Sequence, residues 1–193
     1  MFFRKRDFRP DKTDDGFLSQ IHLTRQQRYA IVRWVLMGLV LLMLSLLQDV
    51  VMSRIRFLGA TTALMPAGIF IACMLMSAEQ GSLFALAGSV FYYYSGASSG
   101  PQVIAVITAM AIVFSIFRHS YLKKGFLSNF LCGGSVMMLY GILIFGIELF
   151  LGNTVSARFG AALAGSAMSV AAMPLMYPIF VSISKIGGET WKD

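Results

Sequence analysis

The residue types that carry chemistry in proteins are few in this sequence and lie far apart. Cys73 and Cys132 each fall inside a long apolar stretch, where a thiol is a poor nucleophile, and His22 and His119 lie in polar segments. A metal site needs several ligands grouped together, and a nucleophile needs a base beside it. The sequence therefore predicts no catalytic residue, no metal site and no cofactor.

Three charged residues lie within or beside the apolar stretches: Arg33, Asp49 and Glu148. A charge at the middle of a bilayer costs about 2.5–3.5 kcal/mol on insertion scales, so such a residue would point to transport or proton relay. Arg33 lies about one helical turn into the first stretch, and Asp49 and Glu148 lie near the ends of theirs. We interpret all three as interfacial, with a buried functional site as the alternative.

These residues belong to a framework of long apolar stretches, in a chain that is 57% hydrophobic and 13% charged. A bilayer core of about 30 Å needs roughly 20 apolar residues per helix. About six stretches approach this length, at residues 29–47, 57–76, 81–94, 102–117, 126–151 and 159–183. The sequence predicts an all-α fold, a polytopic membrane bundle of about six transmembrane helices over residues 29–184. A count that merges or drops the short third and fourth stretches is the alternative.

The basic residues indicate how the helices are oriented. Of the 16 Lys and Arg, 12 lie before the first stretch, between the fourth and fifth (Arg118 among them) or after the sixth, and only Arg54, Arg56 and Arg158 lie on the opposite side. The positive-inside rule then places both termini in the cytoplasm. This asymmetry also accounts for the net charge of +7, so we expect no nucleic-acid partner.

Two short segments flank the membrane domain. Residues 1–28 are a basic cytoplasmic N-terminal segment, of which 16–28 form either an interfacial helix on the lipid surface or a loosely ordered tail. Residues 185–193 are a short cytoplasmic tail.

Small residues cluster on two of the predicted helices. Gly81 and Gly88 share a face of the third helix, and Gly160, Ala164 and Gly165 lie in the sixth. Small side chains allow helices in lipid to approach closely. We expect these residues to pack the bundle on itself, with a docking surface for another protein as the alternative.

Residues 81–100 read G-S-L-F-A-L-A-G-S-V-F-Y-Y-Y-S-G-A-S-S-G. This stretch resembles the G-x-x-F-x-x-G-x-x-x-D-x-x-S-G-x-x-x-G pattern of the bacterial rod shape-determining MreD family. The matching residues are Gly81 and Phe84 in the first part of the pattern and Gly88, Ser95, Gly96 and Gly100 in the second, whereas Tyr92 occupies the acidic position. Three residues separate Phe84 from Gly88, one more than the pattern has. Further similarities extend over about residues 30–187 and include Arg33, Pro66, Arg118 and Pro178.

The resemblance implies a non-enzymatic scaffold of the elongation (cell-shape) machinery in the bacterial cytoplasmic (inner) membrane. Its implied partners are the lipid bilayer, MreC, the RodA and penicillin-binding-protein complex, and MreB-linked machinery. Its implied fold is similar to that of the substrate-binding components of energy-coupling-factor transporters. Packing or partner contacts are then expected at Gly81, Phe84, Gly88, Gly96, Gly100, Gly160, Ala164 and Gly165.

A substrate-binding membrane component of a vitamin or small-molecule importer is the alternative function, because size, span count and termini suit that class equally. Such components commonly carry an A-x-x-x-A coupling face in the first span, which residues 29–47 lack. They also need polar groups that converge near the outer face. The outer connections offer mainly Asp49, Arg54, Arg56, Asn153, Thr154 and Arg158.

Overall fold

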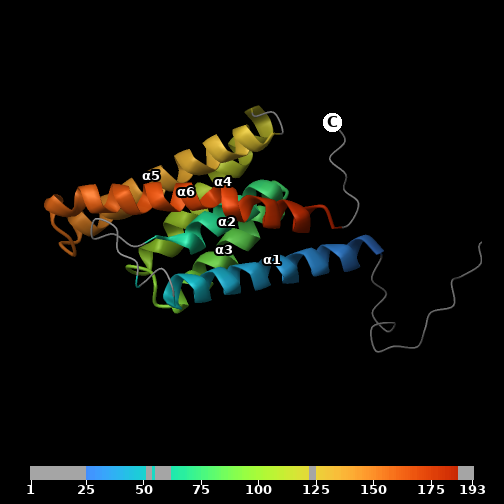
Figure 1. Ribbon diagram of the computed structural model, residues 1–193, viewed down its shortest axis with the longest axis horizontal. Coiled ribbons are helices and arrows are strands. Elements are labelled where there is room, and N and C mark those ends of the chain that lie inside the picture. Colours follow the sequence, from blue (N-terminus) through green and yellow to red (C-terminus); the bar gives the residue numbers. More distant parts are fainter. Residues whose placement is uncertain (1–24, 51–53, 55–61, 122–124, 187–193) are drawn as a thin grey trace, which may run out of the picture.

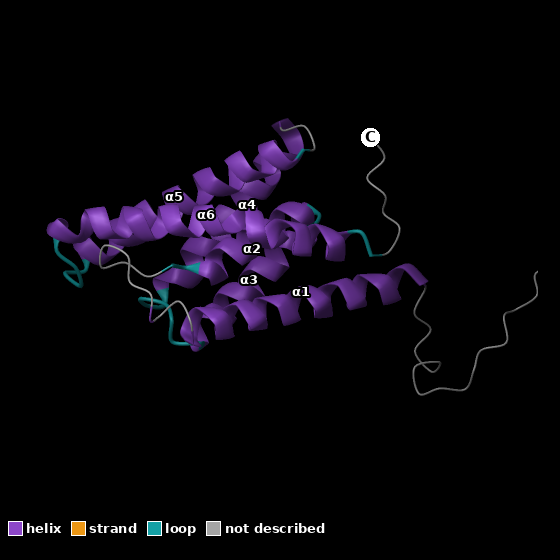
Figure 2. Cartoon of the chain, in the orientation of Figure 1, coloured by secondary structure: helices purple, strands orange, loops and turns teal. Residues whose placement is uncertain are grey.

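The computed structural model describes residues 25–50, 54, 62–121 and 125–186. These residues form helices joined by short loops, with no β-strand among them (Figure 2). The elements in chain order are α1 (Arg25–Val50), α2 (Leu64–Leu75), α3 (Ala78–Tyr94), α4 (Gln102–Tyr121), α5 (Phe126–Phe150), the short 3-10 helix η3 (Ser156–Arg158) and α6 (Phe159–Ser184). The all-helical prediction is confirmed for this part of the chain.

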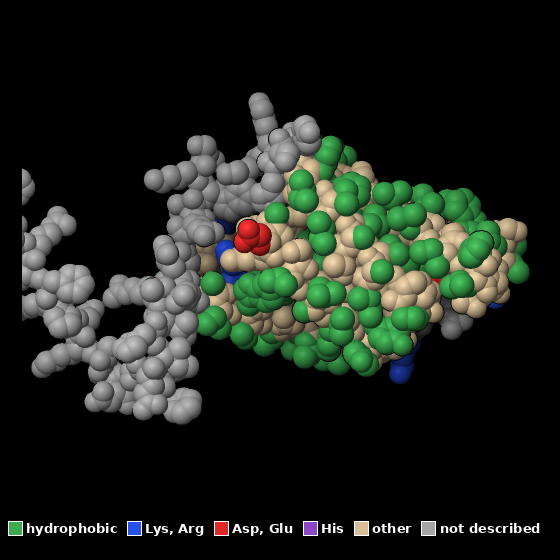
Figure 3. All heavy atoms as spheres, turned by 180° about the vertical axis from the view of Figure 1, so that it is seen from behind, with side chains coloured by type: hydrophobic (Ala, Val, Ile, Leu, Met, Phe, Trp, Pro, Cys, Tyr) green, Lys and Arg blue, Asp and Glu red, His purple; other side chains and the backbone are tan. Residues whose placement is uncertain are grey.

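Three of the described helical segments are long and apolar enough to cross a membrane: Arg28–Val50, Phe126–Phe150 and Ser156–Ser184. Leu64–Leu75 and Gln102–Arg118 are apolar but shorter. The face shown in Figure 3 is covered with hydrophobic side chains over its middle, and charged side chains appear near its two ends. The chain is therefore a membrane protein with a helical bundle.

Most helix bounds lie close to the predicted stretches, with differences at the ends. The exception is α2, which has 12 residues and begins only at Leu64, because Thr62 and Ala63 of the predicted second stretch are not helical. α1 begins at Arg25, α3 begins at Ala78 and α4 continues to Tyr121. Residues 57–61 of the predicted second stretch lie outside the described residues, as do most of the predicted interfacial helix over 16–28 and residues 187–193 of the predicted tail.

Glycines in the left-handed region end two of the helices at the same end of the bundle. Gly96 follows α3 with φ 75°, and Gly152 follows α5 with φ 73°. After α5, the amides of Gly152 and Asn153 donate to the carbonyls of Leu149 and Glu148 at 3.1 and 2.9 Å. This is the hydrogen-bond pattern with which a glycine closes the last helical turn.

The central element of the bundle is α2. All of its 12 residues are buried, and it contacts α1, α3, α4, α5 and α6. The other helices form a ring around it, because α3 contacts α4, α4 contacts α5, α5 contacts α6, and α1 contacts both α6 and α3. Figure 1 shows α2 between the long helices, with the start of α1 and the end of α6 at the same end. We call this the inner end, and the opposite one the outer end.

The ends of α2 are capped by side chains from the surrounding helices. At the outer end, Gln48 of α1 accepts a hydrogen bond from the amide of Met65 at 2.9 Å, and Ser169 of α6 accepts one from the amide of Ala63 at 2.9 Å. At the inner end, Arg118 of α4 donates to the carbonyl of Met74. Because all 12 residues of α2 are buried, the free backbone groups at its ends need such partners.

Candidate functional site

Three of the predicted packing residues, Gly81, Phe84 and Gly88, lie on the buried side of α3. A Cβ atom at Gly81 would lie 2.9 Å from the backbone oxygen of Cys73, and one at Gly88 would lie 3.0 Å from Cγ1 of Ile69. Phe84, between them, is buried and meets the ring of Trp34 edge to face at a centroid distance of 5.5 Å. The two glycines allow α3 to approach α2 closely, and Phe84 between them packs against α1.

The two later glycines of the same stretch have other surroundings. Gly96 is exposed and ends α3, and its left-handed backbone conformation is the reason a glycine suits this position. Gly100 precedes α4, where a Cβ atom would meet the side chain of Gln102. The stretch 81–100 therefore combines a packing face with a helix-ending turn.

The small residues of α6 do not form one continuous buried face. Gly160 is exposed, with no atom within 4 Å of an added Cβ. Ala164 is half-buried, and Gly165 is buried, where it lines a cavity at the outer end.

The three charged candidates also differ in their surroundings. Arg33 is buried, and its Nη2 donates to Oε1 of Gln80 at 2.5 Å, which joins α1 to the start of α3. Asp49 is exposed at the outer end of α1. Glu148 is half-buried near the end of α5 and lines the same cavity as Gly165. Arg33 therefore lies toward the inner end of the bundle, whereas Asp49 and Glu148 lie toward the outer end.

The outer cavity has a volume of about 340 Å³ and lies among α3, the α3–α4 loop, α5 and α6. Its residues of polar or charged type are Tyr92, Ser99, Tyr140, Glu148, Thr154, Arg158 and Ser166. Met137, Tyr140 and Ser166 are buried within it, whereas Arg158 and Ser99 are exposed and belong to its rim. Polar groups from three helices and two loops thus converge in one place.

Tyr92 lies in this cavity, at the position where the resemblance leads one to expect an acid. Its hydroxyl donates to the carbonyl of Ala97 at 3.2 Å, which holds the α3–α4 loop against the helix. Gln48 and Tyr140 also lie within hydrogen-bonding reach of this side chain. Tyr92 therefore connects the cavity with Gln48, which caps the outer end of α2.

A second polar cluster lies at the inner end of the bundle. Nε of the buried Arg118 donates to Oδ1 of Asn129 at 2.8 Å, and Nδ2 of Asn129 donates to the hydroxyl of Tyr177 at 2.7 Å. Sequence reasoning missed this cluster because it assigned Arg118 to the connection after the fourth helix, whereas α4 continues past it. Asn129, a polar residue inside a long apolar stretch, was the available signal.

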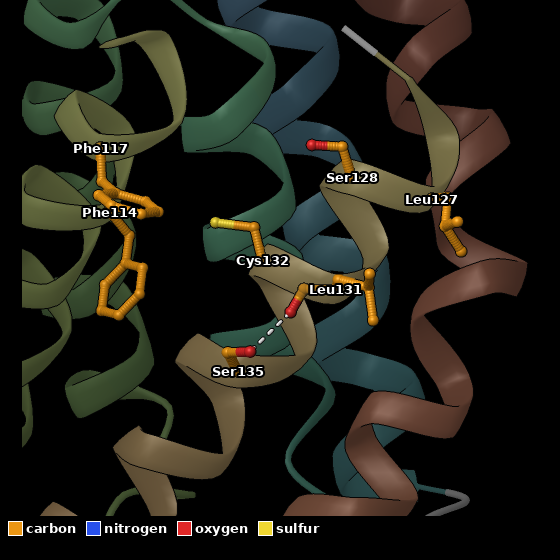
Figure 4. A pocket seen from close by; sticks show the side chains of 7 residues that line it. All are labelled: Phe114, Phe117, Leu127, Ser128, Leu131, Cys132 and Ser135. Atoms are coloured by element: carbon orange, nitrogen blue, oxygen red, sulfur yellow. Dashed lines mark hydrogen bonds between the residues drawn. The ribbon is translucent and has the colours of Figure 1, made fainter. Parts of the chain in front are cut away.

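A groove of about 450 Å³ separates α4 from α5 near the inner end. Phe114 and Phe117 form one side, and the side chains of Ser128 and Cys132 point toward them from the other (Figure 4). Ser135 donates back to the carbonyl of Leu131 in its own helix at 2.8 Å. No charged side chain lines this groove, whereas Glu148 and Arg158 line the outer cavity.

No group of three or more His, Cys, Asp or Glu residues suited to a metal ion occurs in the described part of the chain. No protein-family model, curated protein or solved structure matches the chain.

Proposed function

We propose that this protein is a non-enzymatic membrane scaffold of the bacterial cell-shape machinery, which supports lateral peptidoglycan synthesis by binding partner membrane proteins. The proposed partners are MreC and the RodA and penicillin-binding-protein complex, with MreB-linked machinery on the cytoplasmic side. In this proposal all six helices cross the cytoplasmic membrane, residues 1–28 and 185–193 face the cytoplasm, and the fold is similar to that of energy-coupling-factor substrate-binding components.

The observation that supports the proposal best is the MreD-like stretch and its place in the bundle. Gly81, Phe84 and Gly88 recur at intervals that keep them on one helical face, which packs against α2 through the two glycines and against Trp34 of α1 through Phe84. Close packing of α3 thus explains why glycines and an aromatic residue occur at these spacings. The exposed apolar sides of the helices, such as that of α1 with Val35 and Met43, are available for contact with helices of partner proteins.

Depletion of the protein in its native host tests the proposal. Rod-shaped cells should become rounded or widened because lateral wall synthesis fails. Expression of Gly81→Leu should not restore the rods, since the larger side chain separates α2 from α3, whereas Leu83→Ile, on the exposed side of α3, should restore them. Normal cell shape after depletion would refute the proposal.

A second candidate function, the substrate-binding component of a vitamin or small-molecule importer, is favoured by one observation. The outer cavity offers the converging polar groups that such a component needs. Depletion would then impair uptake of a vitamin while cell shape stays normal, and the protein would co-purify with an ATPase pair rather than with wall-synthesis proteins.

A further inference from the structure

The outer cavity carries one anionic and one cationic side chain. Glu148 lies near the end of α5 and is half-buried, and Arg158 ends η3 and is exposed. The α5–α6 connection, which Gly152 turns back on itself, brings the two residues to the same cavity. A ligand with both an amino and a carboxylate group could use both charges, whereas a singly charged ligand would use only one.

The remaining walls suit a small ring-bearing molecule. Tyr92, Tyr140 and Phe145 supply aromatic surface, and Ser166 of α6 supplies a hydroxyl inside the cavity. Gly141 lies so close to Ser166 that a Cβ atom added to Gly141 would collide with Oγ of Ser166. Any side chain at position 141 would therefore disturb this wall of the cavity. A volume of about 340 Å³ lies at the small end of the range for ligand sites, roughly 300–1,000 Å³.

We propose that the outer cavity binds an amphoteric molecule of the size of an aromatic amino acid, with its amino group at Glu148, its carboxylate at Arg158 and its ring against the two tyrosines. This site goes beyond the scaffold role and does not depend on it, and it names a ligand class for the cavity that favours the importer candidate. The scaffold proposal is tested by cell shape, and this one by ligand binding to the purified protein, so either can fail alone.

Isothermal titration calorimetry of the full chain in lipid nanodiscs provides the test, with L-phenylalanine as the probe. We expect saturable binding. L-Phenylalaninamide lacks the carboxylate and 3-phenylpropionate lacks the amino group, so each should bind about tenfold more weakly, which is the loss expected for one charged hydrogen bond. Absence of binding by L-phenylalanine would overturn the proposal, as would equal binding of either analogue.

Two charge-removing substitutions identify which residue recognises which group. Glu148→Gln should weaken the binding of L-phenylalanine about tenfold and leave the affinity for 3-phenylpropionate unchanged. Arg158→Gln should weaken the binding of L-phenylalanine by a similar factor and leave the affinity for L-phenylalaninamide unchanged. Glu79→Gln at the inner end and Arg54→Gln, which lies outside the cavity lining, are matched controls that should bind like the parent. Equal effects of the control substitutions would contradict the assignment.

Filling the cavity tests its location independently of charge. Ala162 of α6 lines the cavity, and Ala162→Leu should abolish the binding of L-phenylalanine. Ala167→Leu, an exposed position on the same helix, should not. Unchanged affinity of Ala162→Leu for L-phenylalanine would show that the ligand binds elsewhere and would overturn the proposal. If Ala162→Leu does not fold, the exposed substitution Arg158→Gln still tests whether the ligand binds in this cavity.

Discussion

Arg118 of α4 donates a hydrogen bond from Nη1 to the carbonyl oxygen of Met74, in the last turn of α2. The carbonyls at the end of a helix lack partners within it and carry partial negative charge, so a buried cation is well matched to this position. The same guanidinium also holds Asn129 of α5 through Nε. One side chain thus joins the central helix to two members of the ring.

Arg118→Met should destabilise the bundle by about 1.5–3 kcal/mol, because it removes charged hydrogen bonds and leaves the Met74 carbonyl unpaired in an apolar region. The midpoint of SDS-induced unfolding in mixed micelles measures this effect. Arg28→Met, which removes an exposed arginine near the same end, is the control and should shift the midpoint little. Equal shifts in the two variants would show that Arg118 contributes only charge.

Ser169→Ala tests the cap at the other end of α2. The Oγ of Ser169 accepts the amide of Ala63, so its loss should cost about 1 kcal/mol of unfolding free energy. Ser182→Ala, on the same helix, removes an exposed hydroxyl that bonds only to the carbonyl of Pro178 and should be neutral. Identical unfolding curves for Ser169→Ala and the parent would contradict this interpretation.

Gly81→Ala should be costly, because the new Cβ would lie 2.9 Å from the backbone oxygen of Cys73 and α3 would have to move. Such overpacking typically costs about 1–3 kcal/mol. The matched change Gly38→Ala on α1 adds the same methyl group where nothing lies within 4 Å, and it should be neutral or slightly stabilising. Thermal unfolding of both variants, followed by fluorescence-detected gel filtration, compares them directly.

The proposed orientation is tested by single cysteines in a background in which Cys73 and Cys132 are replaced by alanine. Ser156→Cys, in η3 at the outer end, should react with an impermeant maleimide in intact cells. Ser77→Cys, at the exposed turn between α2 and α3, should react only after the cells are permeabilised. Labelling of Ser77→Cys in intact cells would exclude an arrangement with this turn in the cytoplasm.

The positions of the helices could be predicted because apolar run length is a strong signal for a segment in lipid. Which helix lies in the centre could not be predicted in the same way. Ile69 of α2 is fully buried, whereas Val35 of α1 is 62% exposed, yet both are aliphatic residues in apolar stretches. Since lipid tails are as apolar as a protein core, hydropathy does not distinguish a side chain facing protein from one facing lipid.

The outer cavity was only partly predictable. Thr154 and Arg158 were among the polar residues expected at the outer connections, and Glu148 was expected near them. Tyr140 and Ser166 were not expected there, because they lie well inside apolar stretches. They line the cavity because α5 packs against α6. The inner cluster was missed for a related reason, since its members Arg118, Asn129 and Tyr177 come from three different helices.

The position of α2 has a consequence for how the protein is made. A helix of about 18 Å is shorter than the bilayer core of about 30 Å, so α2 has little ability to integrate on its own as it leaves the ribosome. One of its two outer caps, Ser169, belongs to the last helix to be synthesised. In the proposed six-helix arrangement, the outer end of α2 therefore gains its complete set of hydrogen-bond partners only after α6 has been inserted.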